Sequence, residues 1–250
     1  MDETFEYRLP RSCQSAWWIA REIGASILTY QLYPLGIGPT PLPTLPRLPY
    51  PQPAREETPI LFIHGVFHNP STFAWLKQRL AWLGWRNFHE LSLYTSLRPI
   101  AYNAELIAQA VERIRKQFSV KQIDMIAHSM GGILARYYLR FLKGDGRVRN
   151  LVTLATPHQG TSLSRYALFS ELRELSPDSK LFRRLKRSGP PKKTRVVAIS
   201  GELDLLIKPT DHAFWPEVRN IRLRGVGHAG VLFSRRVLQI ITSHLQEDSV

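Results

Sequence analysis

The stretch IDMIAHSMGG, residues 123–132, decides the fold more than any other part of the chain. Its apolar first half is typical of a strand buried on both faces, which we expect at residues 122–127, and a helix is expected from 130 to about 142. Ser129 stands at the junction, with the small residues Ala127 and Gly131 two positions to either side. A serine on such a turn needs an unusual backbone conformation and neighbours without bulk, so the stretch predicts a nucleophile at the carboxyl end of a sheet.

Similar apolar runs and helical patterns alternate on both sides of this stretch. The expected strands are 59–63, 88–94, 122–127, 150–154, 195–200 and 218–223, and the expected helices are 69–84, 101–118, 130–142 and 234–245. Strands that alternate with helices pair in parallel through right-handed crossovers. The chain is therefore predicted to be an α/β protein with a mostly parallel central sheet flanked by helices.

Composition fits one large domain with a short appendage. The 250 residues are 44% hydrophobic and 22% charged, which is enough apolar side chain for a sizeable core. The single cysteine, Cys13, excludes an intramolecular disulfide and a cysteine-based zinc site. The net charge of +14 favours attraction to anionic surfaces such as lipid headgroups. Nucleic acid is not expected as a partner, since no motif of a nucleic-acid-binding fold is present.

The first 55 residues are expected to form an N-terminal extension to a catalytic domain at 56–250. An amphipathic helix is predicted at 14–33, and it either docks on the domain, lies at a membrane interface or, least consistently with its internal charges, spans a membrane. The eight prolines between positions 34 and 53 predict an extended connector. The acidic start of the chain is not that of a signal peptide, so a cytoplasmic or peripheral membrane location is expected.

Residues 161–194 fit no strand and are expected to form a short helical cap. Two short helices are predicted, at 165–175 and 179–185, in a position that would place them over the carboxyl edge of the sheet. Their apolar side chains either line an acyl-binding site or pack on the body of the domain. The basic residues between Arg183 and Arg195 are interpreted as a solvated face.

A serine nucleophile needs a base to take its proton and a carboxylate to orient that base. Asp204 directly follows the expected strand at 195–200, and His228 follows the one at 218–223, so both are predicted at the same edge as Ser129. Asp211 is the rival for the acid. His212 and His244 are the rivals for the base, and both are expected to face solvent.

The oxyanion of the reaction needs backbone donors as well. One is expected to be the amide of Met130, which follows the nucleophile, and the other the amide of Val66, with Phe67 as the alternative. The other histidines near these motifs, namely His64, His128 and His158, are expected to have structural roles.

Together these motifs resemble the α/β-hydrolase superfamily, and within it the bacterial triacylglycerol lipase and esterase branch. The resemblance rests on HGV (64–66), AHSMGG (127–132), TPHQGT (156–161), GELD (201–204) and GH (227–228), and it covers residues 58–245. The elbow around Ser129 is similar to that of small Bacillus lipases, although Ala127 replaces the usual glycine. The resemblance implies an α/β-hydrolase fold, a triad of Ser129, Asp204 and His228, oxyanion amides at Val66 and Met130, and no cofactor. No metal is expected either, since no spacing of His, Asp and Glu residues in the sequence demands one, although some lipases hold calcium or zinc.

The expected activity is hydrolysis of carboxylic esters or lipids through an acyl-enzyme on Ser129. A phospholipase or acyltransferase is the alternative within enzymes. From another class, the alternative is a membrane-attached lipid-binding or adaptor protein that keeps an inactive hydrolase fold. A complete set of nucleophile, base and acid favours the enzyme, because a binding module needs none of them.

Overall fold

The structure is a computed structural model that describes residues 20, 22–25, 27, 58–93, 95 and 97–246. Residues 20, 22–25 and 27 are helical, so part of the expected N-terminal helix is observed. The proline-rich connector at 34–53 and Cys13 lie outside the described residues. No helix in the part of the chain that is described combines the length and the apolar character needed to cross a membrane.

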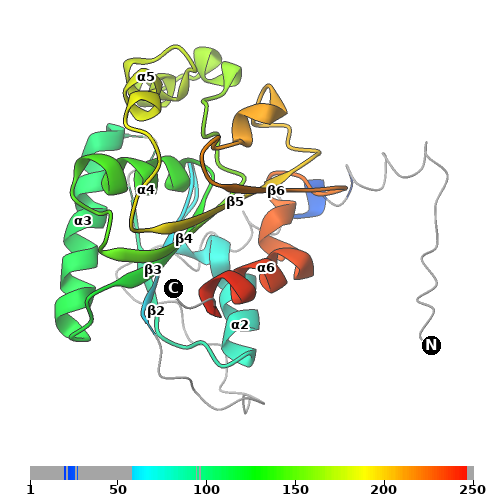
Figure 1. Ribbon diagram of the computed structural model, residues 1–250. Coiled ribbons are helices and arrows are strands. Elements are labelled where there is room, and N and C mark those ends of the chain that lie inside the picture. The colour runs from blue at the N-terminus through cyan, green and yellow to red at the C-terminus, as the bar shows by residue number, and fades with distance from the viewer. Residues whose placement is uncertain are drawn as a thin grey trace.

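Six parallel strands form one central sheet (Figure 1). They are paired in the order β2-β1-β3-β4-β5-β6. Their bounds are β1 Ile60–Ile63, β2 Phe88–Leu91, β3 Ile123–His128, β4 Val148–Leu154, β5 Arg195–Gly201 and β6 Arg219–Leu223. The all-parallel pairing confirms the predicted fold class, and it brings every carboxyl end of a strand to the same edge of the sheet.

Helices cover both faces of this sheet. The helices α3 (Ile100–Gln117) and α4 (Met130–Phe141) lie on one face, and α2 (Ala74–Trp82) and α6 (Arg235–Gln246) lie on the other (Figure 1). Alternate strand residues point to opposite faces. In β1, Leu61 and Ile63 therefore pack with α3 and α4, whereas Ile60 and Phe62 pack with α2 and α6. This is why β1 reads as a continuous apolar run.

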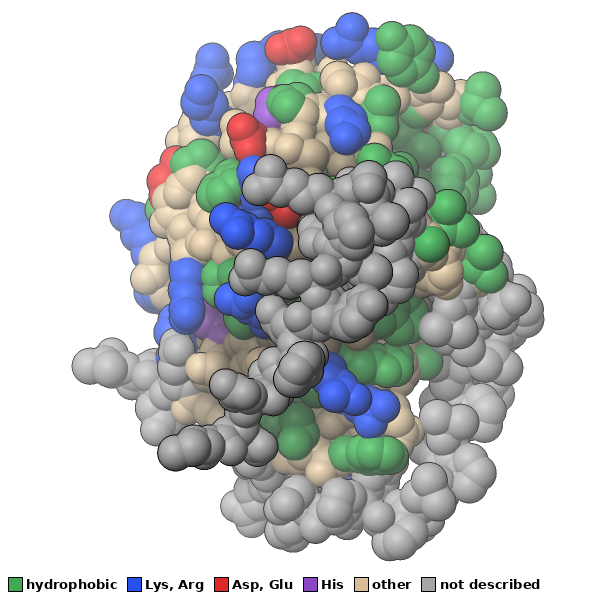
Figure 2. Space-filling model, turned by 90° about the vertical axis from the view of Figure 1, so that its right-hand side faces the viewer, with side chains coloured by type: hydrophobic (Ala, Val, Ile, Leu, Met, Phe, Trp, Pro, Cys, Tyr) green, Lys and Arg blue, Asp and Glu red, His purple; other side chains and the backbone are tan. Residues whose placement is uncertain are grey.

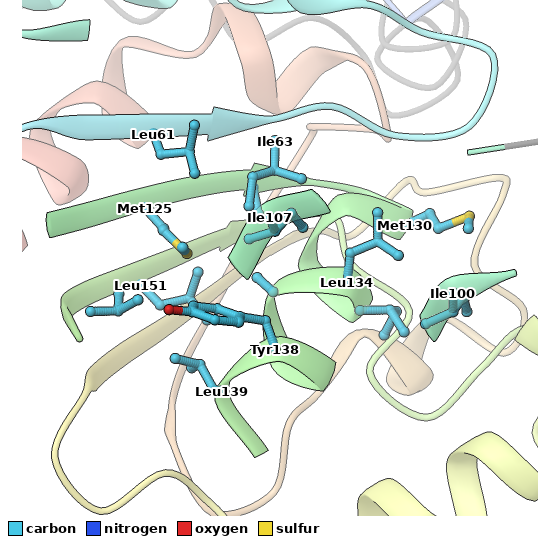
Figure 3. Packing of buried hydrophobic residues seen from close by; sticks show 14 of the residues in the cluster. Leu61, Ile63, Ile100, Ile107, Met125, Met130, Leu134, Tyr138, Leu139 and Leu151 are labelled. Carbon is cyan, nitrogen blue, oxygen red and sulfur yellow. The ribbon is translucent and has the colours of Figure 1, made fainter. Parts of the chain in front are cut away.

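The core on the α3 and α4 side is centred on a tyrosine. Tyr138 of α4 is fully buried, and Figure 3 shows its ring close to Leu151, with Met125 and the two β1 residues Leu61 and Ile63 stacked above it. Burial raises the pKa of the Tyr138 hydroxyl to about 12, so the side chain stays neutral. An aromatic ring of this size fills the space between sheet and helix that smaller side chains would leave open.

Most expected strand boundaries agree with the observed ones, and among the strands β2 shows the largest difference. The strand ends at Leu91 and not at residue 94. The reason is that the Leu93 N–H donates to His64 Nε2, 3.0 Å away, in place of a strand neighbour. The start of the preceding helical segment agrees with the sequence, because the Asn69 side chain accepts from Ser71 N at the beginning of the 3₁₀ helix η2 (Pro70–Phe73).

Residues 161–194 form two 3₁₀ helices and one α-helix. They are η3 (Ser162–Tyr166), η4 (Ser170–Leu175) and α5 (Lys180–Arg187), so the first expected helix is two separate 3₁₀ segments. Leu172 and Leu175 are buried in the same cluster as α3 and α4, as are three residues of α5. These side chains therefore pack on the body of the domain.

Figure 2 shows Lys and Arg side chains spread over one face of the molecule, with fewer acidic side chains among them.

One buried carboxylate ties the middle strands together. Asp124 of β3 accepts from Arg149 of β4 at 2.6 and 3.1 Å, and also from the backbone and side chain of Asn150 at 3.1 and 3.0 Å. Burial raises the pKa of Asp124, and its hydrogen bonds with Arg149 and Asn150 act in the opposite direction. Removing this carboxylate would leave several donors unpaired at the centre of the sheet.

We therefore expect Asp124→Ala to lower the free energy of unfolding by about 2–4 kcal/mol, because a buried ion pair loses one partner. The matched control is Glu112→Ala, which removes a carboxylate that pairs with Arg115 and Arg147 on the surface. That change should cost less than about 1 kcal/mol. Urea unfolding of both variants checks this, and equal losses would contradict it.

Candidate active site

Ser129 sits in the turn between β3 and α4 with a strained backbone. Its φ is 54° and its ψ is −129°, in a region that residues with a Cβ rarely adopt. The turn is tightly enclosed. A Cβ on Gly131 would collide with the backbone oxygens of Ile63 and His64, and a Cβ on Gly132 would collide with Thr156. The small residues after Ser129 thus allow α4 to start directly against β1.

Three side chains from three strand ends meet at this turn. His228 Nε2 lies 3.0 Å from Ser129 Oγ, and His228 Nδ1 lies 2.8 Å from Asp204 Oδ2. The carboxylate can only accept, so Nδ1 carries the proton and Nε2 is left to accept from the serine hydroxyl. Asp204 is 1% exposed and is held in place by the N–H groups of Leu206 and Ile207, which donate to its other oxygen at 2.8 and 3.0 Å.

The alternative residues for the acid and the base lie away from Ser129 and make other interactions. Asp211 pairs with Arg222 at 2.7 Å on the surface. His212 Nδ1 lies 3.0 Å from the carbonyl oxygen of Gly160. The expectation that His244 faces solvent is wrong, since its side chain is buried. It shares the inner face of α6 with Val237 and Ile241, at helical spacing.

The loop after β1 holds one peptide group in a defined orientation. His64 Nε2 accepts from Leu93 N, so its Nδ1 carries the proton and donates to the Gly65 carbonyl oxygen at 2.9 Å. Thr95 Oγ1 donates to the same oxygen at 3.1 Å. Since the carbonyl and N–H of a trans peptide point in opposite directions, the N–H of Val66 is turned away from His64 and Thr95. Val66 lines the same cavity as Ser129.

Thr95 is a residue that the sequence analysis missed. It belongs to a loop with no recognisable motif, and only the folded chain brings it against Gly65.

Met130 occupies the position expected for the second amide. It is the first residue of α4, where backbone N–H groups have no partner within the helix and where the helix dipole favours negative charge.

A cavity of about 850 Å³ opens above the serine. Besides Ser129 and His228, the described side chains that line it come from three segments. They are Val66, Phe67 and His68 after β1, Leu205 and Leu206 after β5, and Glu22, Ile23 and Ile27 of the N-terminal helix, and Ala229 adds to the lining directly after His228. Phe67 has a positive φ of 53°, and its ring lies 5.8 Å from that of Phe169. The wall of the cavity is therefore mainly apolar.

Neutral histidines surround the ring of His228. The His128 ring lies 5.0 Å from that of His228, and its Nε2 faces the His228 carbonyl oxygen at 3.1 Å. Burial, followed by the proximity of His228, holds the pKa of His128 well below its usual range. For the same two reasons, the pKa of His68 is lowered to about 4. Near pH 7, His68 and His128 are therefore neutral.

A buried arginine, Arg136, contacts the TPHQGT segment at residues 156–161. Arg136 of α4 donates to the carbonyl oxygens of His158 and Leu185, at 2.8 and 3.3 Å, and its guanidinium lies 4.4 Å from the ring centre of Trp215. Burial lowers the pKa of Arg136 to about 10. His158 itself is within 2.9 Å of Thr153 Oγ1.

Within the described residues, no group of three or more His, Cys, Asp or Glu side chains is placed to hold a metal ion.

The buried histidines predict that stability falls in mild acid. Burial lowers the pKa of His64 to about 4, against 6.5 in the unfolded chain. Below pH 6.5 the unfolded chain binds a proton that the native chain does not. The stabilisation is therefore complete above pH 6.5 and is lost as the pH falls towards 4. From pH 7 to pH 5, His64 alone should cost about 2 kcal/mol.

The measurement is urea unfolding of the wild type and of His64→Gln at both pH values. The variant should show a smaller loss between pH 7 and pH 5, because it removes one titrating group. His212→Gln is the matched control, at a half-buried position on the surface, and it should leave the difference nearly unchanged. An identical pH dependence in the wild type and His64→Gln would contradict the assignment.

The chain is similar to solved structures and to curated sequences of other proteins. The chain is similar to the mature form of the Bacillus licheniformis lipase BlEst2, with a TM-score of 0.67 and 18% identity over 79% of this chain and 96% of the other. That likeness shows a shared fold, and it agrees with the expected α/β-hydrolase fold.

Two curated relatives match parts of the chain. Triacylglycerol lipase 2 of Saccharomyces cerevisiae is 32% identical over 34% of this chain and 26% of its own length. Putative esterase/lipase 3 of Mycoplasma pneumoniae is 32% identical over 55% of this chain and 50% of its own length. The matched part thus spans about a quarter of the first relative and half of the second.

A family model described as a PGAP1-like alpha/beta domain matches residues 87–219, which is just over half of the chain. The matched range begins just before β2 and ends at the start of β6, so it includes the turn at Ser129 and the position of Asp204. The chain therefore belongs to the family of PGAP1-like α/β domains. Its partial similarity to a lipase and to a putative esterase/lipase agrees with the expected lipase and esterase branch of the α/β-hydrolase superfamily.

Proposed function

We propose that this protein is a serine hydrolase of carboxylic esters that works through an acyl-enzyme. The observation that carries the proposal is the hydrogen-bonded chain from Asp204 through His228 to Ser129, at the base of a mainly apolar cavity. Its distances are within the range in which a base can take the proton of a nucleophile.

In the first half of the reaction, Ser129 Oγ attacks the ester carbonyl carbon while its proton passes to His228 Nε2. The imidazolium that forms is balanced by the Asp204 carboxylate on Nδ1. The carbonyl oxygen becomes an oxyanion, which accepts from the N–H groups of Val66 and Met130. When the tetrahedral intermediate collapses, His228 returns the proton to the leaving alcohol and the acyl group stays on Oγ.

In the second half, water takes the place of the alcohol. His228 accepts a proton from the water, whose oxygen attacks the acyl carbon, and a second oxyanion forms at the same two amides. Collapse breaks the bond to Ser129 Oγ, which regains its proton from His228, and the carboxylic acid leaves. The neutral state of His68 and His128 supports both halves, because a positive charge on either would oppose protonation of His228.

The apolar cavity favours esters with a substantial hydrocarbon part, and the names of the two curated relatives point to lipase or esterase chemistry. Glycerolipids and phospholipids both contain such esters, and transfer of the acyl group to an alcohol other than water would use the same acyl-enzyme. A binding protein with an inactive hydrolase fold remains the alternative from another class, and it predicts no turnover at all.

We expect hydrolysis of p-nitrophenyl esters from acetate to palmitate by the wild type, and its loss in Ser129→Ala. The rate should fall by about 10⁴-fold or more, because the nucleophile is gone. A fluorophosphonate probe should label the wild type and spare this variant. Ser170→Ala, at an exposed position of η4, is the matched control and should keep both properties. No turnover on any ester and no labelling would favour the binding protein.

Thr95 provides a test of the oxyanion site. Thr95→Val removes the donor to the Gly65 carbonyl and keeps the shape of the side chain, so the peptide that carries the Val66 N–H loses one of its two constraints. We expect kcat to fall about tenfold with little change in KM, which is less than the 10²–10³ lost with a direct donor. Thr95→Ser keeps the hydroxyl and should restore kcat. Equal effects of Val and Ser would contradict this role.

A further inference from the structure

The helical residues 20, 22–25 and 27 lie against the loop that carries His228. In Figure 1 this short blue segment is next to β6 and the orange start of α6, at the opposite end of the colour scale. Two hydrogen bonds agree with that view. The carboxylate of Glu22 accepts from the N–H groups of Ala229 at 2.5 Å and Gly230 at 2.9 Å.

These two amides belong to the start of a 3₁₀ helix, η6 (Gly230–Phe233), immediately after His228. Such amides have no partner within their own helix, so a carboxylate is a strong acceptor for them. The fit is close, because a Cβ on Gly227 would collide with the Glu22 carboxylate and one on Gly230 would lie 2.9 Å from it. The glycine at position 227 therefore leaves space for the Glu22 carboxylate beside the loop that follows β6. Any residue with a Cβ at this position would occupy that space.

The contact with Glu22 places two isoleucines in the cavity wall. Ile23 and Ile27 are four residues apart, so they lie on the same side of the helix, and both line the cavity that holds Ser129 and His228. Each is about half exposed, although it is a large apolar side chain. Leu205 and Leu206, which also line the cavity, are exposed to a similar degree. Apolar side chains that face a cavity from different segments favour an apolar ligand between them.

We propose that Ile23 and Ile27 are specificity-determining residues that contact the hydrocarbon part of the ester, and that Glu22 is the positioning residue that holds them beside His228. This inference rests on the proposed ester hydrolysis and adds the residues that select the substrate. Each methylene buried against this wall stabilises binding, so the preference for longer esters depends on the two side chains.

The test measures kcat/KM for p-nitrophenyl decanoate divided by that for p-nitrophenyl acetate. We expect this ratio to fall about tenfold in Ile23→Ser combined with Ile27→Ser, because the long ester loses apolar contacts that the short one does not reach. Leu83→Ser is the matched control. It removes a partly exposed leucine at the end of α2, outside the cavity lining, and should leave the ratio unchanged.

Glu22 is tested in the same assay. Glu22→Ala should lower the ratio as the serine variants do, because the helix loses its two hydrogen bonds to the His228 loop. Glu22→Gln should restore part of it, since the amide oxygen still accepts from a backbone N–H. Thermal unfolding of every variant, monitored by circular dichroism, shows whether the domain stays folded.

The outcomes separate this inference from the proposed function. If the isoleucine variant hydrolyses both esters with an unchanged ratio of kcat/KM for decanoate to that for acetate, Ile23 and Ile27 do not determine specificity. The proposed ester hydrolysis would still stand. An equal fall for acetate and decanoate also overturns the inference about Ile23 and Ile27, because it indicates a structural role for the helix. If the wild type hydrolyses no ester and takes no fluorophosphonate label, the proposed function is wrong. The inference about Ile23, Ile27 and Glu22 would then be wrong as well.

Discussion

The two hydrogen bonds of the His228 ring are the interactions on which the site depends. They join the turn after β3 to the loops after β5 and β6, and so connect residues 99 and 24 positions apart in the chain. A parallel sheet makes this possible, because it brings the carboxyl ends of all its strands to one edge. The buried Asp204 then sets the tautomer of the ring, and with it the direction in which the proton of Ser129 can move.

Three of the polar side chains near Ser129 and His228 are histidines that stay neutral near pH 7. His64, His68 and His128 are buried or nearly so, and burial lowers the pKa of each. The neutral rings of His64 and His128 still form hydrogen bonds, and His64 uses both nitrogens to hold the Gly65 peptide and the Leu93 amide. His64 thus shapes the loop, and none of the three neutral rings places a positive charge beside the proposed base.

Local sequence signals predicted much of the fold and site, and they failed where several elements meet. Strands such as β1 and β5 were predictable from their apolar runs, ILFI and VVAI, and Asp204 and His228 stood out because each follows a strand. His244 was placed wrongly because a polar residue near a helix end reads as exposed, although its spacing from Ile241 puts it inside. The helix expected at 165–175 divides into two 3₁₀ segments, with Leu172 and Leu175 packed in the core.

The sequence by itself determined the order of strands and helices, the turn at Ser129 and the identity of the acid and base candidates. Those features depend on residues that are neighbours along the chain or repeat with a fixed period. Only the tertiary structure decided that Thr95 holds the Gly65 carbonyl and that Glu22 bonds to the loop after His228. Each of these contacts joins segments far apart in sequence, and a single threonine or glutamate carries no local signal of its partner until the chain has folded around it.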